Sequence, residues 1–212
     1  MKLVFYLLAL LTFISCGQTE KRKEKYKVDL KAQELNNRGV KLALTLNEDS
    51  ILKAISMLDQ ATKIQPDYYL AHWNKFIYQN QLGLTKDALT TLKDLEKLTP
   101  ENPDWKVELG IFMEVNGDSL KAREKYVEAD RLYKSILDTL TSKTEPYQMI
   151  LTNRAVNLKL LGYENEGDKI LKEISSKQAD TTLKELFECF VTMTRKELIE
   201  NFKQRNGKYP NL

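Results

Sequence analysis

Side chains that could carry out chemistry are scarce in this chain of 212 residues. It holds one histidine, His72, and two cysteines, Cys16 and Cys189. A zinc site or a histidine-based acid–base pair at His72 would have to be completed by carboxylates alone, because the sequence has no second histidine and no nearby thiol. We therefore expect His72 to be a surface or groove side chain beside Trp73, and we expect no metal site and no cofactor.

The carboxylates form no recognisable catalytic pattern. Pairs such as Asp94 with Glu96 lie among lysines in a chain with 30% charged residues, which is typical of solvated helix faces. The sequence contains no G-x-S-x-G, no phosphate-binding glycine loop, no H-E-x-x-H and no Cys–His pair. We predict that the protein is not an enzyme and that it has no small-molecule substrate.

Cys16 stands at the end of a short apolar segment near the start of the chain. The 12 residues Leu3–Ile14 are too few to span a bilayer, which takes ~20, but they suit a secretory signal. The following Ser15-Cys16-Gly17 resembles a bacterial lipobox. That resemblance implies that residues 1–15 are a signal peptide, that cleavage precedes Cys16, and that acyl chains such as palmitate are attached there. An ordinary cleaved signal with an incidental cysteine is the alternative.

Residues 16–30 are expected to form a flexible, basic tether behind the lipidated cysteine. This stretch is polar and dense in charge, with no apolar periodicity. Its basic excess can favour an anionic lipid surface, or the stretch can be a solvated spacer. The formal net charge of +3 arises near the start of the chain, so the remainder has no basic field and we expect no nucleic-acid partner.

Small residues and prolines recur along the chain every 34 residues. Ala54, Ala88 and Ala122 keep this spacing, and so do Pro66 and Pro100. Between them, apolar residues recur at i, i+3, i+4 and i+7, which predicts amphipathic helices and an all-α fold. A period of this length is typical of helical hairpins that cannot bury an apolar face alone and must stack on one another.

The residues at the repeated positions resemble those of tetratricopeptide repeats (TPR). The best match contains Leu109-Gly110 and Met113, then Ala122-x₃-Tyr126 and Ala129, with the small residues where helix backbones approach closely. The resemblance implies a right-handed superhelical solenoid of antiparallel helix pairs, with about four units and a C-terminal capping helix or helix pair. We expect a repeat domain at 31–206, with units at about 31–66, 67–100, 101–145 and 146–179, a cap at 180–206 and a loose tail at 207–212.

Capping residues predict where several helices begin and end. The expected N-caps are Asp49-Ser50, Thr85, Asn102 and Asp118, and the segment Thr194 to Glu197 has the capping-box pattern. Gly117 and Gly162, which suit turns after a helix, are 45 residues apart, 11 more than the period. Because 11 residues make nearly three helical turns, we expect one lengthened helix from about Ser119 to Thr141.

In the TPR family the first helices of successive units line a concave groove, and the resemblance implies a binding surface there. A mixture of apolar and amide side chains in such a groove suits an extended or helical peptide. Trp73, Ile77 and Trp105 can instead pack between helices. The expected partner-binding residues are Asn36, Val40, Trp73, Ile77, Asn80, Gln81, Val107, Ile111, Glu114 and Val115.

These features together predict a non-catalytic adaptor lipoprotein of the bacterial cell envelope that binds a protein or peptide partner through its concave face. A permanent structural or assembly subunit of an envelope complex is the first alternative. An all-α ligand-binding or hydrolytic lipoprotein is the second. Gly17 after Cys16 fits the outer membrane better than the inner membrane, by analogy with other lipoproteins, so the domain is expected in the periplasm or at the cell surface.

Overall fold

The computed structural model describes residues 27–141 and 145–206. The helices are α3 (Leu30–Ala43), α4 (Glu48–Ile64), α5 (Tyr69–Gln81), α6 (Thr85–Leu98), α7 (Pro103–Val115), α8 (Ser119–Leu137), α9 (Glu145–Leu160), α10 (Glu164–Ser176), α11 (Thr181–Thr192) and α12 (Arg195–Asn206). In this part of the chain there is no β-strand, and no helix is long and apolar enough to cross a membrane. Cys16, the signal segment, most of the tether and the tail at 207–212 lie outside the described residues.

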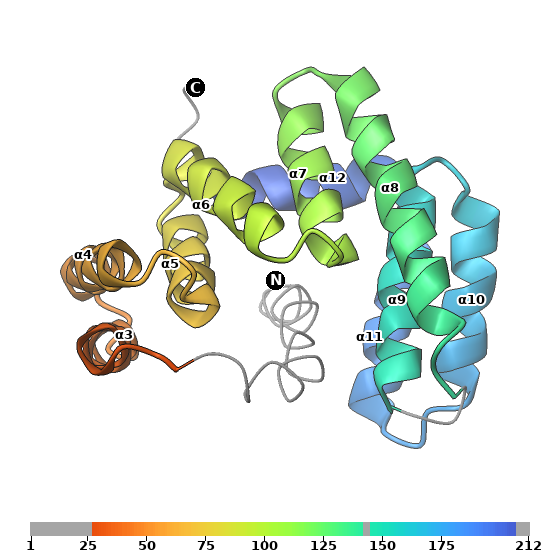
Figure 1. Ribbon diagram of the computed structural model, residues 1–212. Helices are drawn as coiled ribbons and strands as arrows, with labels where there is room; N and C mark the ends of the chain where they lie inside the picture. Colours follow the sequence, from red (N-terminus) through yellow and green to blue (C-terminus); the bar gives the residue numbers. More distant parts are fainter. Residues whose placement is uncertain (1–26, 142–144, 207–212) are drawn as a thin grey trace.

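Helices α3 to α10 form four successive pairs that stack along one direction (Figure 1). Each helix packs against the next one in the chain, and α3 also packs against α5. The predicted all-α solenoid of helix pairs is therefore confirmed. Burial explains the stacking, because each amphipathic helix has an apolar stripe that only a neighbouring pair can cover.

A glycine closes the first helix in three of these pairs. Gly83, Gly117 and Gly162 have φ values of 68°, 86° and 89°, in the left-handed region where glycine carries no Cβ penalty. The expected N-caps at Asn102 and Asp118 are present, since their side chains accept hydrogen bonds from Asp104 N–H and Lys121 N–H. The turns between paired helices are thus specified by local chemistry.

Two other helix starts differ from the expectation. Asn47, and not Asp49-Ser50, caps α4, and its side chain accepts a hydrogen bond from Ser50 N–H at 3.2 Å. Helix α6 begins without a side-chain cap, because the Thr85 hydroxyl donates to the carbonyl of Gly83 at 3.3 Å instead. Both expected caps were therefore wrong, since α4 already begins at Glu48 and Leu84 precedes α6 without a capping side chain.

Helix α8 is long, with 19 residues, but it ends at Leu137 and not near Thr141. Beyond it, Thr139 N–H and Leu140 N–H donate to carbonyls three residues back, which makes a tighter turn than an α-helix. The apolar residues of this turn still pack, since Leu140 lies against the cluster of Ala129, Tyr133 and Ile150. The apolar stripe therefore continues beyond the last residue of the helix.

The largest core cluster lies where α5, α6, α7 and α8 meet. Its centre is Trp105, which is 2% exposed and whose indole N–H donates to Thr99 Oγ1 at 2.9 Å. A Cβ atom added at Gly110 would lie 2.4 Å from Cε1 of Tyr126, so α7 and α8 approach closely there as expected. The buried members of this cluster include Phe76, Leu92, Leu95, Trp105, Leu109, Phe112 and Tyr126.

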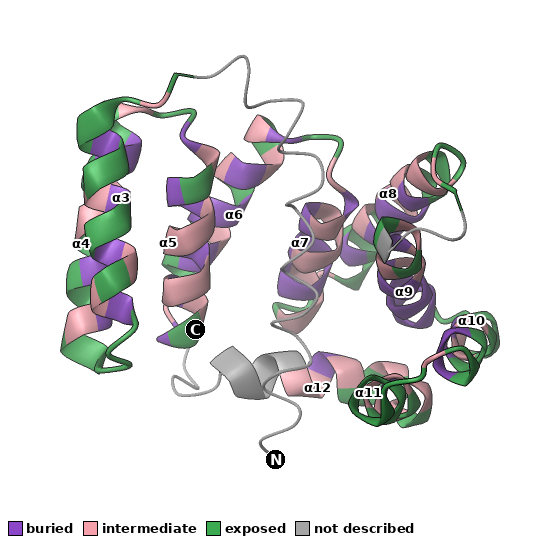
Figure 2. Ribbon diagram, turned by 90° about the horizontal axis from the view of Figure 1, so that it is seen from below, coloured by how far each residue is buried: buried purple, intermediate pink, exposed green. Residues whose placement is uncertain are grey.

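The two C-terminal helices separate after residue 192. Helix α11 packs on α10 and continues the stack, whereas α12 turns back and packs against α5, α7 and α9. Figure 2 shows α12 crossing α7 below the stacked pairs. The turn between α11 and α12 contains the predicted capping box, in which Glu197 Oε2 accepts from Thr194 N–H at 2.8 Å and Thr194 Oγ1 accepts from Glu197 N–H at 3.2 Å.

Candidate functional site

The candidate site is the face formed by α3, α5, α7 and α9, the first helices of the four pairs. The expected partner-binding residues all lie on three of these helices, α3, α5 and α7. On α3, Asn36 is only 2% exposed, and its Oδ1 accepts a hydrogen bond from Asn74 Nδ2 at 2.9 Å. Val40, one turn later, is half-buried. The structure therefore places Asn36 between helices and leaves Val40 partly accessible.

On α5 the expected residues have a mixed environment. The ring of Trp73 is half-buried, with its centroid 5.1 Å from that of Trp105, and Ile77 packs against the same cluster. Asn80 is half-buried, and its Oδ1 is a buried atom with no hydrogen-bond partner among the described residues. Gln81 is exposed. Trp73 and Ile77 thus pack between helices and also keep part of their surface accessible.

On α7 the expected residues are more enclosed. Val107 and Val115 are half-buried, and Ile111 is 8% exposed within the large core cluster. The side chain of Glu114 is 10% exposed and pairs with an arginine from α12. This part of the face is covered by α12, and local sequence patterns do not predict that contact because the two helices are far apart in the chain.

Arg195, the first residue of α12, holds that helix to the face. Its guanidinium donates to Glu114 Oε1 at 2.5 Å and to the carbonyl of Leu160 at 2.7 Å. Its backbone N–H donates to Glu164 Oε1 at 3.2 Å. The second oxygen of Glu114 accepts from the Tyr126 hydroxyl at 3.2 Å, and burial together with the Glu114 carboxylate raises the pKa of Tyr126 well above its usual value. Tyr126 is therefore a permanent donor to Glu114.

The apolar side of α12 completes the contact. Ile199 is 8% exposed and belongs to the large core cluster, and Leu198 is half-buried against both this cluster and the one around α11. Arg195, Leu198 and Ile199 stand at i, i+3 and i+4, so they share one face of the helix. The buried residues of the cluster that Ile199 joins include Phe76, Trp105, Ile111, Phe112, Leu160 and Leu161.

A buried lysine fixes the end of α11. Lys159 on α9 is 1% exposed, and its ammonium donates to the carbonyls of Phe190 and Val191 at 2.9 and 3.0 Å and to the carboxylate of Asp168. It therefore satisfies carbonyls in the last turn of α11, where the helix dipole favours a cation. Gly167 makes room for the lysine, because a Cβ atom there would lie 2.7 Å from Cγ of Lys159.

A second polar contact joins the three helices α7, α8 and α9. Asp104 Oδ1 accepts from the Tyr133 hydroxyl at 2.6 Å and from Asn153 Nδ2 at 3.1 Å. Burial raises the pKa of Asp104, while these two hydrogen bonds lower it. Burial and the neighbouring carboxylate raise the pKa of Tyr133, which stays a donor. These hydrogen bonds hold the long α8 against its neighbours, although Asn153 Oδ1 is buried without a hydrogen-bond partner among the described residues.

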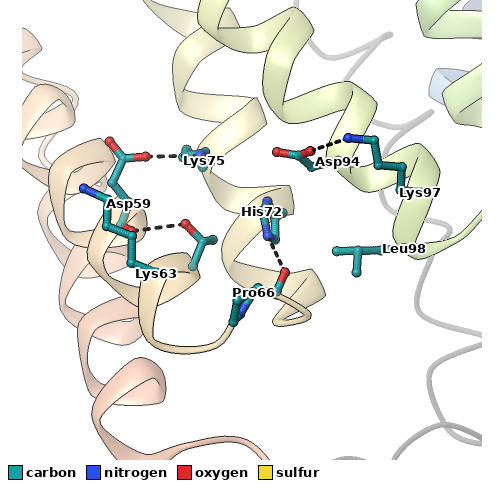
Figure 3. A pocket seen from close by; sticks show the side chains of 9 residues that line it. Asp59, Lys63, Pro66, His72, Lys75, Asp94, Lys97 and Leu98 are labelled. Carbon is teal, nitrogen blue, oxygen red and sulfur yellow. Dashed lines mark hydrogen bonds and ion pairs between the residues drawn. The ribbon is translucent and has the colours of Figure 1, made fainter.

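A separate cavity of about 460 Å³ lies between α4, α5 and α6 (Figure 3). His72 was expected to be a surface or groove side chain; it is 6% exposed and lines this cavity, so only the surface alternative was wrong. Its Nε2 lies 2.9 Å from the carbonyl of Pro66, and its Nδ1 is buried without a hydrogen-bond partner among the described residues. The cavity is lined by Asp59, Thr62, Lys63, Pro66, His72, Lys75, Asp94, Lys97 and Leu98.

The charges around this cavity largely neutralise one another. Lys75 pairs with Asp59 at 3.1 Å and Lys97 with Asp94 at 3.2 Å, as Figure 3 shows. Burial lowers the pKa of His72, so its ring is neutral near pH 7. The hydrogen bond of His72 goes to a backbone carbonyl and not to a carboxylate, which is not the arrangement of a general acid–base pair. Within residues 27–141 and 145–206, no group of three metal-ligating side chains comes together.

Comparison with known proteins points to the same class as the fold. No family model matches the chain. The chain is similar to the TPR repeat-containing protein MJ0941 of Methanocaldococcus jannaschii, with 32% identity over 72 residues. This match covers 34% of the present chain and 21% of that relative, so the chain spans about a fifth of its length. The protein is an all-helical repeat protein similar to TPR proteins.

Proposed function

We propose that this protein is a non-catalytic adaptor that binds a protein or peptide partner through the face formed by α3, α5, α7 and α9. The observation that carries the proposal is the position of α12, since a short amphipathic helix already lies on this face and packs against three of its four helices. A surface that accommodates one such helix has the shape and chemistry to accommodate another.

The side chains on α3 and α5 suit this function. Val40, Trp73 and Ile77 each keep part of an apolar surface accessible, and Asn80 and Gln81 add amide groups. A partly exposed tryptophan among apolar neighbours is a common centre of binding energy, because it loses a large area of water contact when a partner covers it. The amides can fix the orientation of a peptide backbone.

We further propose that the protein is held on a bacterial envelope membrane, with the outer membrane preferred, by acyl chains on Cys16. The proposal rests on the likeness of Ser15-Cys16-Gly17 to a lipobox. Each buried CH₂ group contributes about 0.8 kcal/mol, so two or three chains give a stable anchor where one does not. Mass spectrometry of the mature N-terminus tests this proposal, and an unmodified Cys16 or cleavage elsewhere would contradict it.

Cross-linking in intact membranes tests the binding function. We expect a defined partner protein to be captured by the wild-type chain and lost with Trp73→Ala, while the melting temperature shows that the variant is folded. Tyr163→Ala is the matched control, because Tyr163 is an aromatic residue that is 51% exposed in the turn between α9 and α10 and is not among the expected partner-binding residues. Equal loss of the partner with both variants would contradict a specific binding face.

One observation favours the alternative of a permanent subunit in a larger complex. Leu44, Leu46 and Leu120 are 75%, 76% and 81% exposed, and they lie at or beside the turns within the α3–α4 and α7–α8 pairs. Exposed leucines of this kind are covered in a stable assembly. Two results together would favour this alternative. The isolated protein would aggregate and the double variant Leu44→Ser/Leu46→Ser would not, and Trp73→Ala would leave partner capture unchanged.

A further inference from the structure

Helix α12 is much more polar than the surface on which it lies. Its sequence is Arg195-Lys-Glu-Leu-Ile-Glu-Asn-Phe-Lys-Gln-Arg-Asn206, in which apolar residues are few. It begins at a capping box, so its start is encoded locally and needs no tertiary contact. A helix of this length is marginal in isolation. Its order in the folded protein therefore depends on the face beneath it.

The described contacts between α12 and the face lie close together. Ile199 enters the core cluster, Leu198 packs at its edge, and Arg195 pairs with Glu114. The arginine side chain is 35% exposed, whereas that of Glu114 is 10% exposed, so water reaches one partner of the ion pair. Lys196 and Glu197 of the first turn are exposed. Arg195, Leu198 and Ile199 thus lie on the helix side that meets the face, and Asn201 Nδ2 also donates to Met193 Sδ at 3.6 Å.

Helix α11 has its own attachment to α9 and α10, although Leu198 of α12 also packs at the edge of its cluster. It packs on α10, and its apolar residues join a cluster with Ala155, Val156 and Leu171. Lys159 binds the carbonyls in its last turn. Met193 and Thr194 lie between the two helices. Their backbone hydrogen bonds are those of the helix ends, from Met193 N–H to the carbonyl of Cys189 and from Leu198 N–H to the carbonyl of Thr194. A rotation in this turn can move α12 and leave α11 in place.

We propose that α12 is a displaceable occupant of the proposed binding face and that the partner is an amphipathic helix with the same recognition chemistry. Such a helix presents one cation followed, at i+3 and i+4, by two adjacent apolar side chains. Its cation pairs with Glu114, and its apolar residues take the places of Leu198 and Ile199. This inference rests on the proposed function, because it names the kind of partner that the same face binds.

Competition with α12 sets a condition on the partner. The tethered helix is always near its site, so a second helix with only the same contacts binds weakly. The apparent affinity falls by the fraction of molecules in which the face is free. A partner must therefore add contacts that α12 does not make, and Val40 and Gln81 offer accessible surface for them on α3 and α5.

The test uses the full chain and a fluorescent peptide with the sequence of residues 194–206. Fluorescence anisotropy measures its binding to the wild-type chain and to the Ile199→Asp variant, in which the intramolecular contact is weakened. We expect the variant to bind the peptide about tenfold more tightly than wild type does. Lys196→Asp is the matched control, because it places the same residue at an exposed position of the same helix and should leave binding at the wild-type level.

Charge reversal tests the predicted recognition. Glu114→Arg in the Ile199→Asp chain should weaken peptide binding about tenfold, and a peptide carrying Arg195→Glu should restore it. Equal peptide binding by the wild-type and Ile199→Asp chains would overturn the proposal. The proposal would also be overturned if the wild-type chain formed a dimer and the Ile199→Asp variant a monomer, because α12 would then bind the face of a second copy of the chain.

If the Ile199→Asp variant does not fold, amide hydrogen exchange on the wild-type chain tests the proposal instead. We expect amides of α12 to exchange about tenfold faster than those of α7 and α9, with α11 unchanged by saturating peptide. Equal protection of α12 and α7 would make α12 a fixed part of the core and overturn the proposal. Peptide binding without any captured envelope protein would leave this inference standing and contradict the proposed function, so the two failures can be distinguished.

Discussion

Arg195 donates a hydrogen bond of 2.5 Å to Glu114, a residue 81 positions earlier in the chain. This contact joins the first residue of α12 to the last turn of α7, and it places a C-terminal helix on the face formed by the first helices of the repeats. Because Glu114 also accepts from Tyr126, one carboxylate connects α7, α8 and α12. The face proposed to bind a partner is therefore partly covered by a helix of the same chain.

The Arg195–Glu114 pair should contribute measurably to stability, but only modestly. A double-mutant cycle with Arg195→Met and Glu114→Gln should give a coupling energy of about 1 kcal/mol, because the arginine is partly exposed and screened by water. Urea denaturation measures it. The exposed pair Lys97–Asp94 is the control and should give a value near zero. Equal coupling energies for the two pairs would contradict the prediction.

Two glycine-to-alanine changes should destabilise the protein for different reasons. Gly110→Ala places a methyl group against the ring of Tyr126 and should lower the free energy of unfolding by about 1–3 kcal/mol. Gly117→Ala meets nothing within 4 Å but has a φ of 86°, so it should lose about 1–2 kcal/mol through backbone strain alone.

Replacing Tyr126 separates these two causes. Tyr126→Leu should couple with Gly110→Ala, so that their double variant is more stable than the sum of the two single effects predicts. The effects of Tyr126→Leu and Gly117→Ala should instead be additive. Thermal or urea unfolding of the three single and two double variants provides the comparison. Additive behaviour of Gly110→Ala with Tyr126→Leu would show that the close approach of α7 and α8 is not the source of the destabilisation.

Lys159→Met should release the end of α11. The substitution leaves the Phe190 and Val191 carbonyls without their donor and Asp168 without its cation, so we expect a loss of about 3 kcal/mol in the free energy of unfolding. Hydrogen exchange of α11 should accelerate. Lys177→Met removes an exposed lysine that pairs with Glu173 and should change stability by less than about 0.5 kcal/mol.

His72 should make the protein less stable in mild acid. Burial lowers the pKa of His72 in the folded chain below its value near 6.5 in the unfolded chain, so the unfolded state binds the proton more readily. This stability is complete above about pH 6.5 and is lost as the pH falls below that value. Nearby Lys75 also lowers the pKa, whereas Asp94 and Asp59 raise it.

Urea denaturation between pH 5 and pH 8 measures this dependence, and His72→Gln should flatten it in the interval below about pH 6.5. Asn74→Gln, a change on the same helix at a residue that does not titrate, is the control and should leave the slope of stability against pH at its wild-type value. A His72→Gln variant that keeps the full wild-type slope would show that another group causes the acid sensitivity.

Much of the fold follows from local patterns. The 34-residue spacing predicts the helix pairs, the glycines at 117 and 162 lie in the expected turns, and the capping box at Thr194 is present. These features are predictable because each depends on residues within one or two helical turns. The end of α8 was missed by about one turn, because the apolar stripe continues through a tighter turn that has similar side-chain spacing.

The candidate site was predictable only in part. The expected residues do lie on the first helices of the repeats, but neither the burial of Asn36 nor the pairing of Glu114 with Arg195 could be read from them. His72 and Lys159 look like ordinary polar positions on helices, and both are almost fully buried. His72 and Lys159 both bond to backbone carbonyls, which every residue carries, so these contacts leave no distinguishing signal in the sequence. Lys159 also pairs with Asp168, one of many carboxylates near a lysine in this chain.

The amino-acid sequence by itself determined the helices, their pairing and the surface formed by their first members, because helix periodicity, capping and glycine turns act over a few residues. Only the tertiary structure decided what lies on that surface. The residues of the short, polar α12 do not by themselves specify where this helix packs. Its position depends on Glu114, Leu160 and Ile111 meeting in space after the repeats have stacked, and that meeting is a property of the folded chain.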